Sequence, residues 1–180
     1  MPRDYLNEIS RYDPTTVPWK DEYTRTLSAA PHELATLCYW IDFMEIKTYL
    51  EVGTAGGALM HFFMGYMGLN VYGIDQGSPL MISDDLLFKG DSKSQAAIDW
   101  AIKRAPFDMV YIDADHHYES VVSDFNNYGS LSKKIVAFHD ISHQHVDGVR
   151  KFWDKLDGMK LEVIVPGVGK GTGILFLKGN

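Results

Sequence analysis

The sequence predicts a single α/β domain built on a seven-stranded, mainly parallel sheet with helices on both faces and an antiparallel hairpin at one edge. Two observations predict this class. Short apolar runs alternate with helical stretches over most of the chain, which is typical of β-α-β units and a parallel sheet. The last two apolar runs are joined only through residues 166–171, Pro-Gly-Val-Gly-Lys-Gly, which leave no room for a crossover helix. Those two runs should therefore pair antiparallel.

Apolar periodicity places each element in turn. A helix begins at Pro31, because proline is favoured in a first turn and Leu34, Leu37, Cys38 and Ile41 then recur at three- and four-residue spacing. The seven strands are predicted at 48–52, 70–74, 86–89, 109–112, 134–138, 161–165 and 174–178. The other helices are predicted at 58–67, 94–104, 118–128 and 146–156. Between 75 and 86 the chain is too short for a full crossover helix, so a loop or reduced turn is expected there.

Length and composition favour one domain preceded by an arm. The chain has 180 residues, 46% of them hydrophobic, which is enough for one sizeable core and too short for two. Residues 1–30 mix prolines with tyrosines and a tryptophan, a composition typical of an irregular arm that packs by its aromatic side chains. We therefore predict an aromatic N-terminal arm over 1–30 and the folded domain over 31–180.

The charge balance argues against nucleic acid and the hydropathy argues against a membrane. The formal net charge is −7, from 24 acidic and 17 basic residues, and such a surface repels a phosphate backbone. No run approaches the roughly 18 consecutive apolar residues that span a bilayer, and the first residues carry no signal-peptide core. We expect a cytoplasmic protein. The single cysteine, Cys38, lies among apolar residues and is interpreted as a buried thiol.

A glycine-rich segment follows the first predicted strand. Residues 51–57, Glu-Val-Gly-Thr-Ala-Gly-Gly, place small side chains between a strand and a helix, where backbone can approach a ligand and the helix N-terminus offers free N–H groups. Such a turn also occurs for purely conformational reasons. Asp75 ends the next strand and could accept hydrogen bonds from a ribose, or cap the turn that follows.

The order of these motifs resembles the class I S-adenosylmethionine-dependent methyltransferases, which have a Rossmann-like fold. The resemblance covers residues 31–178 and includes the segment Gly90-Asp91-Ser92 after the third strand. It implies S-adenosylmethionine as cofactor. The implied cofactor-binding residues are Glu51, Gly53, Thr54, Ala55, Gly57, Asp75, Gln76, Asp91, Ser92 and Asp113, with Asp75 at the ribose and Asp91 and Ser92 at the adenine. An NAD site fits less well, because the spacing is Gly53-x-x-Gly56-Gly57 rather than G-x-G-x-x-G.

Acids and histidines follow the fourth and fifth predicted strands. Asp113, Asp115 and His116 come after one apolar run, and His139 with Asp140 after the next. Because ligands bind at the carboxyl ends of parallel strands, these side chains should face the same crevice as the glycine segment. Oxygen and nitrogen donors of this kind hold divalent ions; carboxylates favour magnesium or manganese, and imidazole shifts the preference toward zinc, iron or nickel.

The stretch Ile112-Asp-Ala-Asp-His-His-Tyr118 resembles a narrower branch, the small macrocin and rhamnosyl O-methyltransferases and the cephalosporin-hydroxylase-like proteins. This resemblance implies Asp113, His139 and Asp140 as ligands of Mg²⁺ or another divalent ion. The chain departs from the branch at residues 132–134, Ser-Lys-Lys, where a Gly-Gly is usual, and at His139, where relatives often have an acid.

Methyl transfer to oxygen needs an aligned hydroxyl and a base or metal to remove its proton. His116 is the candidate base, supported by Asp113; capping the helix that begins near Tyr118 is the structural alternative, and His117 could exchange roles with His116. Asp124 is expected to make a structural contact. The hypothesis is a methyltransferase acting on a hydroxyl of a small molecule or sugar. The alternative is a noncatalytic S-adenosylmethionine-binding or partner subunit. The sequence leaves the oligomeric state open, with a homo-oligomer as one option.

Overall fold

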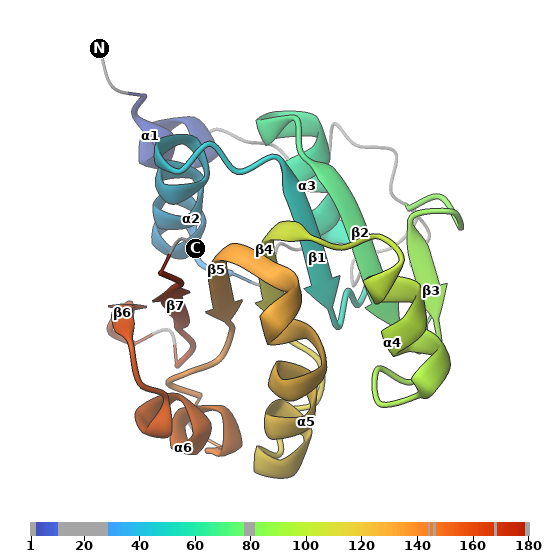
Figure 1. Cartoon of the computed structure of the whole chain (residues 1–180). Helices are drawn as coiled ribbons and strands as arrows, with labels where there is room; N and C mark the ends of the chain where they lie inside the picture. Colours follow the sequence, from blue (N-terminus) through green and yellow to red (C-terminus); the bar gives the residue numbers. More distant parts are fainter. Residues whose placement is uncertain are drawn as a thin grey trace.

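Seven strands form one mixed sheet in the order β3-β2-β1-β4-β5-β7-β6 (Figure 1). The computed structural model describes residues 3–10, 29–77, 82–143, 145, 147–167 and 169–178. All neighbouring strands from β3 to β5 pair parallel, and β7 pairs antiparallel with both β5 and β6. The predicted fold class, including the antiparallel hairpin at one edge, is confirmed.

The strands and helices lie close to the predicted ranges. The strands are β1 Thr48–Val52, β2 Asn70–Asp75, β3 Leu87–Lys89, β4 Phe107–Ile112, β5 Ser132–Phe138, β6 Met159–Val163 and β7 Thr172–Phe176. The helices are α1 Tyr5–Ser10, α2 Pro31–Phe43, α3 Ala58–Met67, α4 Gln95–Ile102, α5 Tyr118–Tyr128 and α6 Gly148–Lys155. A short 3-10 turn, η2, covers Gly129–Leu131.

The two hairpin strands begin two residues earlier than the apolar runs predict. In β7 the reason is that small residues belong to the ladder: Gly173 pairs with Phe138, and Thr172 pairs with Val163. In β6 the two added residues, Met159 and Lys160, pair with Phe176 and Leu175. A Cβ atom at Gly173 would come within 2.9 Å of the Trp153 ring, so only glycine fits beneath that side chain. Apolar periodicity alone does not register such a strand position.

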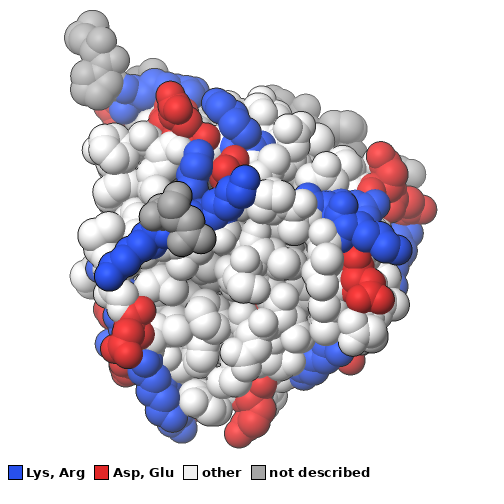
Figure 2. All heavy atoms as spheres, in the orientation of Figure 1, with Lys and Arg blue, Asp and Glu red and all other residues white. Residues whose placement is uncertain are grey.

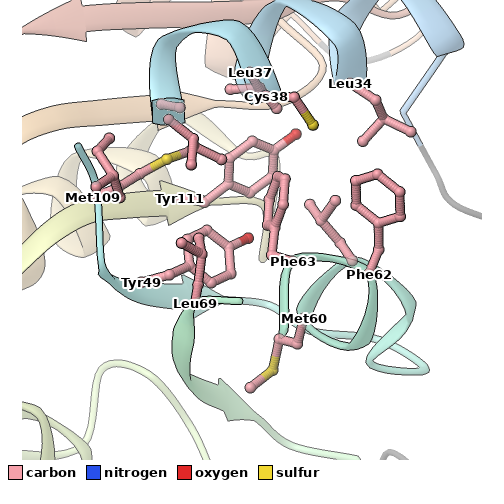
Figure 3. Packing of buried hydrophobic residues seen from close by; sticks show 14 of the residues in the cluster. Leu34, Leu37, Cys38, Tyr49, Met60, Phe62, Phe63, Leu69, Met109 and Tyr111 are labelled. Carbon is pink, nitrogen blue, oxygen red and sulfur yellow. The ribbon is translucent and has the colours of Figure 1, made fainter. Parts of the chain in front are cut away.

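The helices cover the two faces of the sheet in two groups. Helices α1, α2 and α3 enclose one core against one face, and α4, α5 and α6 enclose a second core against the other (Figure 1). Figure 3 shows the first core, where Leu34, Cys38, Phe63 and Tyr111 pack between α2, α3 and the sheet. Burial raises the pKa of Cys38 to about 12, so this thiol is inert, as its apolar neighbours in the sequence suggest.

The N-terminal region differs from the irregular arm predicted over 1–30. Residues Tyr5–Ser10 form helix α1, which packs on α2. Tyr5 and Ile9 are buried in the first core, and this burial stabilises a helix too short to persist alone. Most of the predicted arm, residues 11–28, lies outside the described residues.

The surface of the folded chain carries charges of both signs (Figure 2). Figure 2 shows basic and acidic side chains mixed around the rim of one face, with a largely uncharged centre. Within the described residues, no helix has the length and apolar character needed to cross a bilayer. The absence of a nucleic-acid partner stays a prediction.

Candidate functional site

The carboxyl ends of four adjacent strands are level with one another. Val52 pairs with both Ile74 and Ile112, and Ile112 pairs with Phe138. Asp75, which ends β2, and Gly53, Asp113 and His139, which follow β1, β4 and β5, therefore lie side by side at one edge of the sheet. Strand order reverses between β1 and β4, and ligands bind at such a switch point in open α/β sheets.

The glycine segment is held tightly against the β4 end. Gly53 has a φ of +89°, and a Cβ atom there would come within 2.4 Å of the Asp113 carbonyl oxygen and the Ala114 Cα. Only glycine combines this backbone conformation with this approach. Gly57 adopts the left-handed conformation at the N-cap of α3. It is not among the described residues that line the two cavities at the strand ends, whereas the neighbouring Gly56 is.

The first strand-end cavity lies over β1, β2 and β3. Its volume is about 380 Å³. It is lined by Gly53, Ala55, Ile74, Asp75, Gln76, Gly90, Asp91, Ser92, Lys93, Asp113, Ala114 and Asp115. Seven of the ten residues predicted to bind the cofactor are thus brought together here, and Lys93, which the sequence analysis did not single out, joins them directly after Ser92.

Asp75 binds the backbone of the glycine segment. Its Oδ2 accepts hydrogen bonds from the N–H groups of Thr54 and Ala55, both at 2.8 Å, and its Oδ1 accepts one from Gly77 at 2.6 Å. Asp75 therefore caps its own turn, as one of its two interpretations has it, and it also lines the first cavity; the contact with a ribose stays a prediction.

Ser92 is held from below by a buried acid. Its hydroxyl donates to Asp124 Oδ1 at 2.8 Å, and its carbonyl accepts from the Tyr128 hydroxyl at 2.5 Å. Asp124 is fully buried in α5, which agrees with the structural contact expected from its sequence position. Burial raises the pKa of Asp124 to about 6, partly offset by the Ser92 hydrogen bond and by Lys93.

This raised pKa predicts a pH-dependent stability. A carboxyl group whose folded pKa lies above its ordinary 3.8 stabilises the fold at low pH and loses that contribution as the pH rises through about 6. Asp124→Asn should therefore raise the free energy of unfolding at pH 8 by about 2–3 kcal/mol, at 1.36 kcal/mol per pKa unit. The gain should shrink by roughly 1–2 kcal/mol at pH 5. Urea unfolding of both proteins at the two pH values measures this; an equal gain at both would contradict it.

The second strand-end cavity adjoins the first over β1, β4 and β5. Its volume is about 500 Å³. It is lined by Glu51, Gly53, Thr54, Ala55, Gly56, Ala58, Leu59, Asp113, Ala114, His116, His139, Asp140 and Lys170. Gly53, Ala55, Asp113 and Ala114 line both cavities, so the two form one continuous site. Lys170 comes from the β6–β7 connection, and only the tertiary fold brings it here.

Acids and histidines gather in this second cavity as predicted. Asp113 Oδ1 lies 3.3 Å from His116 Nε2 and 3.2 Å from His139 Nδ1. Asp140 lies 3.5 Å from His116 Nε2 through Oδ2 and 3.6 Å from His139 Nδ1 through Oδ1. His117 does not join them: its side chain is 80% exposed and contacts Asp115. The structure therefore places His116, and not His117, beside Asp113 and Asp140; the role of His116 as a base stays a prediction.

Interactions within the cluster lower the pKa of Asp113 and raise the pKa values of His116 and His139. Burial opposes ionisation of Asp113, but the charge of His139 and the hydrogen bonds from both histidines outweigh it and lower its pKa. The hydrogen bond to Asp113 raises the pKa of His116 above its ordinary value, against the effect of burial. Burial favours neutral His139, yet the charges of Asp113 and Asp140 raise its pKa as well.

Glu51 lies beneath the cluster on β1. It is 3% exposed, and its Oε2 accepts a hydrogen bond from the Tyr49 hydroxyl at 3.0 Å. Burial, with the nearby charge of Asp113, raises its pKa well above the ordinary value. Such a group favours a cationic ligand atom, because a positive charge would restore its ionised form.

Three of the acids and histidines could hold a metal ion. Asp113, His139 and Asp140 each offer one ligand atom, and these atoms all lie within 4.8 Å of one another. Asp140 Oδ1 is buried and has no hydrogen-bond partner among the described residues. A buried carboxylate oxygen without a partner is costly, and a cation beside it would remove that cost. The donor set therefore fits a divalent ion.

A third cavity, of about 650 Å³, lies away from this edge between α1, α2 and the segment after β6. Its lining includes Tyr5, Leu6, Tyr39 and Ile164. None of the acids and histidines of the strand-end cluster is among its described lining residues. We therefore assign the candidate site to the two cavities at the strand ends.

Comparison with known proteins establishes the fold. No family model matches the chain, and no curated protein matches it. Among solved structures, an O-methyltransferase from Bacillus cereus in complex with SAH superposes with a TM-score of 0.62 at 16% identity, covering 99% of this chain and 93% of that one. The O-methyltransferase TomG from Streptomyces achromogenes in complex with SAM gives 0.57 at 18% identity, covering 99% and 92%.

A third structure adds a metal to the comparison. MycE methyltransferase from the mycinamycin biosynthetic pathway, in complex with Mg and SAH, gives a TM-score of 0.61 at 15% identity. The comparison covers 97% of this chain and 55% of MycE, so the chain spans about half the length of that protein. At these identities the likeness shows a shared methyltransferase-like fold.

Proposed function

We propose that the protein is an S-adenosylmethionine-dependent methyltransferase that methylates a hydroxyl of a small molecule or sugar with the help of a divalent metal ion. One observation carries the proposal. The glycine segment with Asp75, and the cluster of acids and histidines, line two adjoining cavities at one strand-end edge. The fold neighbours whose structures contain SAM, SAH or magnesium support the same assignment.

The cofactor is proposed to lie along the first cavity and reach into the second. Asp75 and Gln76 would bind the ribose, and Asp91 with Ser92 would bind the adenine. The backbone of residues 53–57 would pass against the methionine part, above Glu51. Asp113 lines both cavities, so it would lie near the sulfonium carbon that is transferred.

The acceptor is proposed to enter the second cavity, where His116 would take its proton. His116 Nε2 is oriented by Asp113 Oδ1 at 3.3 Å, and its side chain is 28% exposed, so solvent and substrate can reach it. As the acceptor oxygen forms its bond to the methyl carbon, the carbon–sulfur bond breaks and the hydroxyl proton would pass to His116 Nδ1, because Nε2 carries the proton that it donates to Asp113. Asp113, His139 and Asp140 would hold a metal ion, which when bound supplies Lewis-acid polarisation of the acceptor oxygen.

Binding of S-adenosylhomocysteine tests the cofactor site. We expect micromolar binding by calorimetric titration, weakened about 10- to 100-fold by Asp75→Ala, because a hydrogen bond to a charged group contributes roughly 1.5–3 kcal/mol. Asp75→Asn keeps an oxygen that can accept from the N–H groups of Thr54 or Ala55. It should bind more weakly than the wild type while melting close to it.

The matched control is Asp99→Asn on α4, an exposed acid that contacts Gln95 and lies outside both strand-end cavities. It should bind as the wild type does. Absence of binding by the wild type would overturn the proposed cofactor. Binding without methyl transfer to any of a broad panel of sugar, phenolic and aliphatic hydroxyls would instead favour a noncatalytic S-adenosylmethionine-binding subunit.

A further inference from the structure

We infer that Glu33 positions His139 as an imidazole ligand, and that the resulting metal site prefers a divalent transition-metal ion over magnesium. This inference deepens the proposed function, since it concerns the metal that would act at the same site. In the sequence, Glu33 stands only as an acid two residues after Pro31, in the first turn of a helix. Its part in the site depends on the packing of α2 against the sheet.

Glu33 is a fully buried carboxylate at the N-terminal turn of α2. Its Oε2 accepts a hydrogen bond from the Thr172 hydroxyl at 2.6 Å, and its Oε1 accepts one from the Ala30 N–H at 3.2 Å. The same Oε2 lies 3.7 Å from His139 Nε2. Two hydrogen bonds from separate elements thus hold the carboxylate in place behind the imidazole.

His139 presents its two ring nitrogens to opposite sides. It is 2% exposed, its Nδ1 faces Asp113 and Asp140, and its Nε2 faces Glu33. Nε2 has no hydrogen-bond partner at bonding distance among the described residues. A metal-bound histidine commonly directs its second nitrogen at a carboxylate, which fixes the tautomer and strengthens the ligand. The Asp113 side is therefore the metal side, and the Glu33 side is the orienting side.

A second observation, at Asp140, also points to a bound cation in the cluster. It is 5% exposed, its Oδ1 lacks a partner among the described residues, and this oxygen faces His139 Nδ1 across the cluster. With Asp113, it gives the site two carboxylates and one imidazole.

This donor set decides the metal class. Magnesium binds oxygen ligands and retains several waters, and it gains little from a nitrogen donor. Imidazole is a good ligand for zinc, iron, cobalt and nickel, whose affinities for mixed nitrogen and oxygen sites exceed that of magnesium. The Glu33 carboxylate, directed at Nε2 of His139, increases the basicity of the imidazole and so strengthens the preference for a transition-metal ion.

Metal titration of the whole protein, stripped of metal and free of S-adenosyl compounds, tests the inference. Cobalt(II) is the probe, because its visible absorption reports ligand nitrogen and coordination geometry directly. We expect cobalt to bind at least ~100-fold more tightly than magnesium, measured by competition. His139→Asp should lower the ratio of cobalt affinity to magnesium affinity about 10-fold or more, because it exchanges the imidazole for an oxygen ligand. Equal affinity for both ions, or no cobalt binding, would overturn the inference.

Glu33→Gln tests the positioning role. We expect cobalt affinity to fall 10- to 100-fold and the cobalt spectrum to change, the effect usual for a lost outer carboxylate. Glu119→Gln is the matched control: Glu119 is an exposed acid in the first turn of α5 and is not among the described lining residues of either strand-end cavity, so cobalt affinity should change less than about threefold. If Glu33→Gln had no more effect than Glu119→Gln, or if it weakened cobalt binding without changing the cobalt spectrum, Glu33 would be a structural residue only.

The two proposals fail separately. Cobalt selectivity without S-adenosylhomocysteine binding would support the inference about the metal and overturn the proposed methyltransferase function. S-adenosylhomocysteine binding without cobalt selectivity would support the proposed cofactor and overturn the inference about the metal.

Discussion

Replacing Gly53 with alanine should destabilise the protein by about 3 kcal/mol or more and abolish S-adenosylhomocysteine binding. The left-handed backbone at φ +89° costs an alanine roughly 1–2 kcal/mol. The added Cβ would also lie 2.4 Å from backbone atoms of Asp113 and Ala114, which belong to the end of a central strand and cannot yield easily. Such overpacking adds typically 1–3 kcal/mol. Urea unfolding and calorimetric titration measure the two effects.

Gly65→Ala provides the matched control. Gly65 lies in the exposed part of α3, and a Cβ atom there would meet nothing within 4 Å. Alanine is favoured over glycine in a helix by up to about 1 kcal/mol, so this variant should be slightly more stable than the wild type and bind normally. If Gly53→Ala were as stable and as competent as Gly65→Ala, the close approach of β1 and β4 at the site would be refuted.

Replacing Asp113 with asparagine should reduce kcat/KM by about 10²- to 10⁴-fold while the protein remains folded. Asp113 Oδ1 contacts both His116 and His139, so the change removes the charge that orients the proposed base and one proposed metal ligand at once. The loss expected for a misdirected general base alone is in this range. The measurement is release of S-adenosylhomocysteine with the best hydroxyl acceptor found in a panel of sugars and phenols.

His117→Gln is the control for this experiment. His117 belongs to the same loop, but its side chain is 80% exposed and contacts Asp115 rather than the cluster. Its kcat/KM should stay within about twofold of the wild type, as is usual for exposed positions outside a site. A comparable loss in both variants, or full activity of Asp113→Asn, would remove Asp113 from the proposed mechanism.

The sequence by itself determined the order of elements and the side chains at the strand ends. Alternating apolar runs report burial directly, and the ranges 48–52, 58–67 and 118–128 agree with β1, α3 and α5. Because parallel strands direct their carboxyl ends to one edge, Asp75, Asp113 and His139 could be expected in one crevice before any contact was known. Short-range patterns carry this information.

Only the tertiary structure decided which groups act together across long sequence distances. Glu33 lies 106 residues before His139, and nothing in its local sequence separates it from an ordinary first-turn acid. Lys170 reaches the site through the hairpin connection, and Gly173 enters its strand because Trp153 packs over it. Periodicity records which residues are buried along one element. Contacts between elements depend on how the helices pack on the sheet, so they emerge only when the chain is folded.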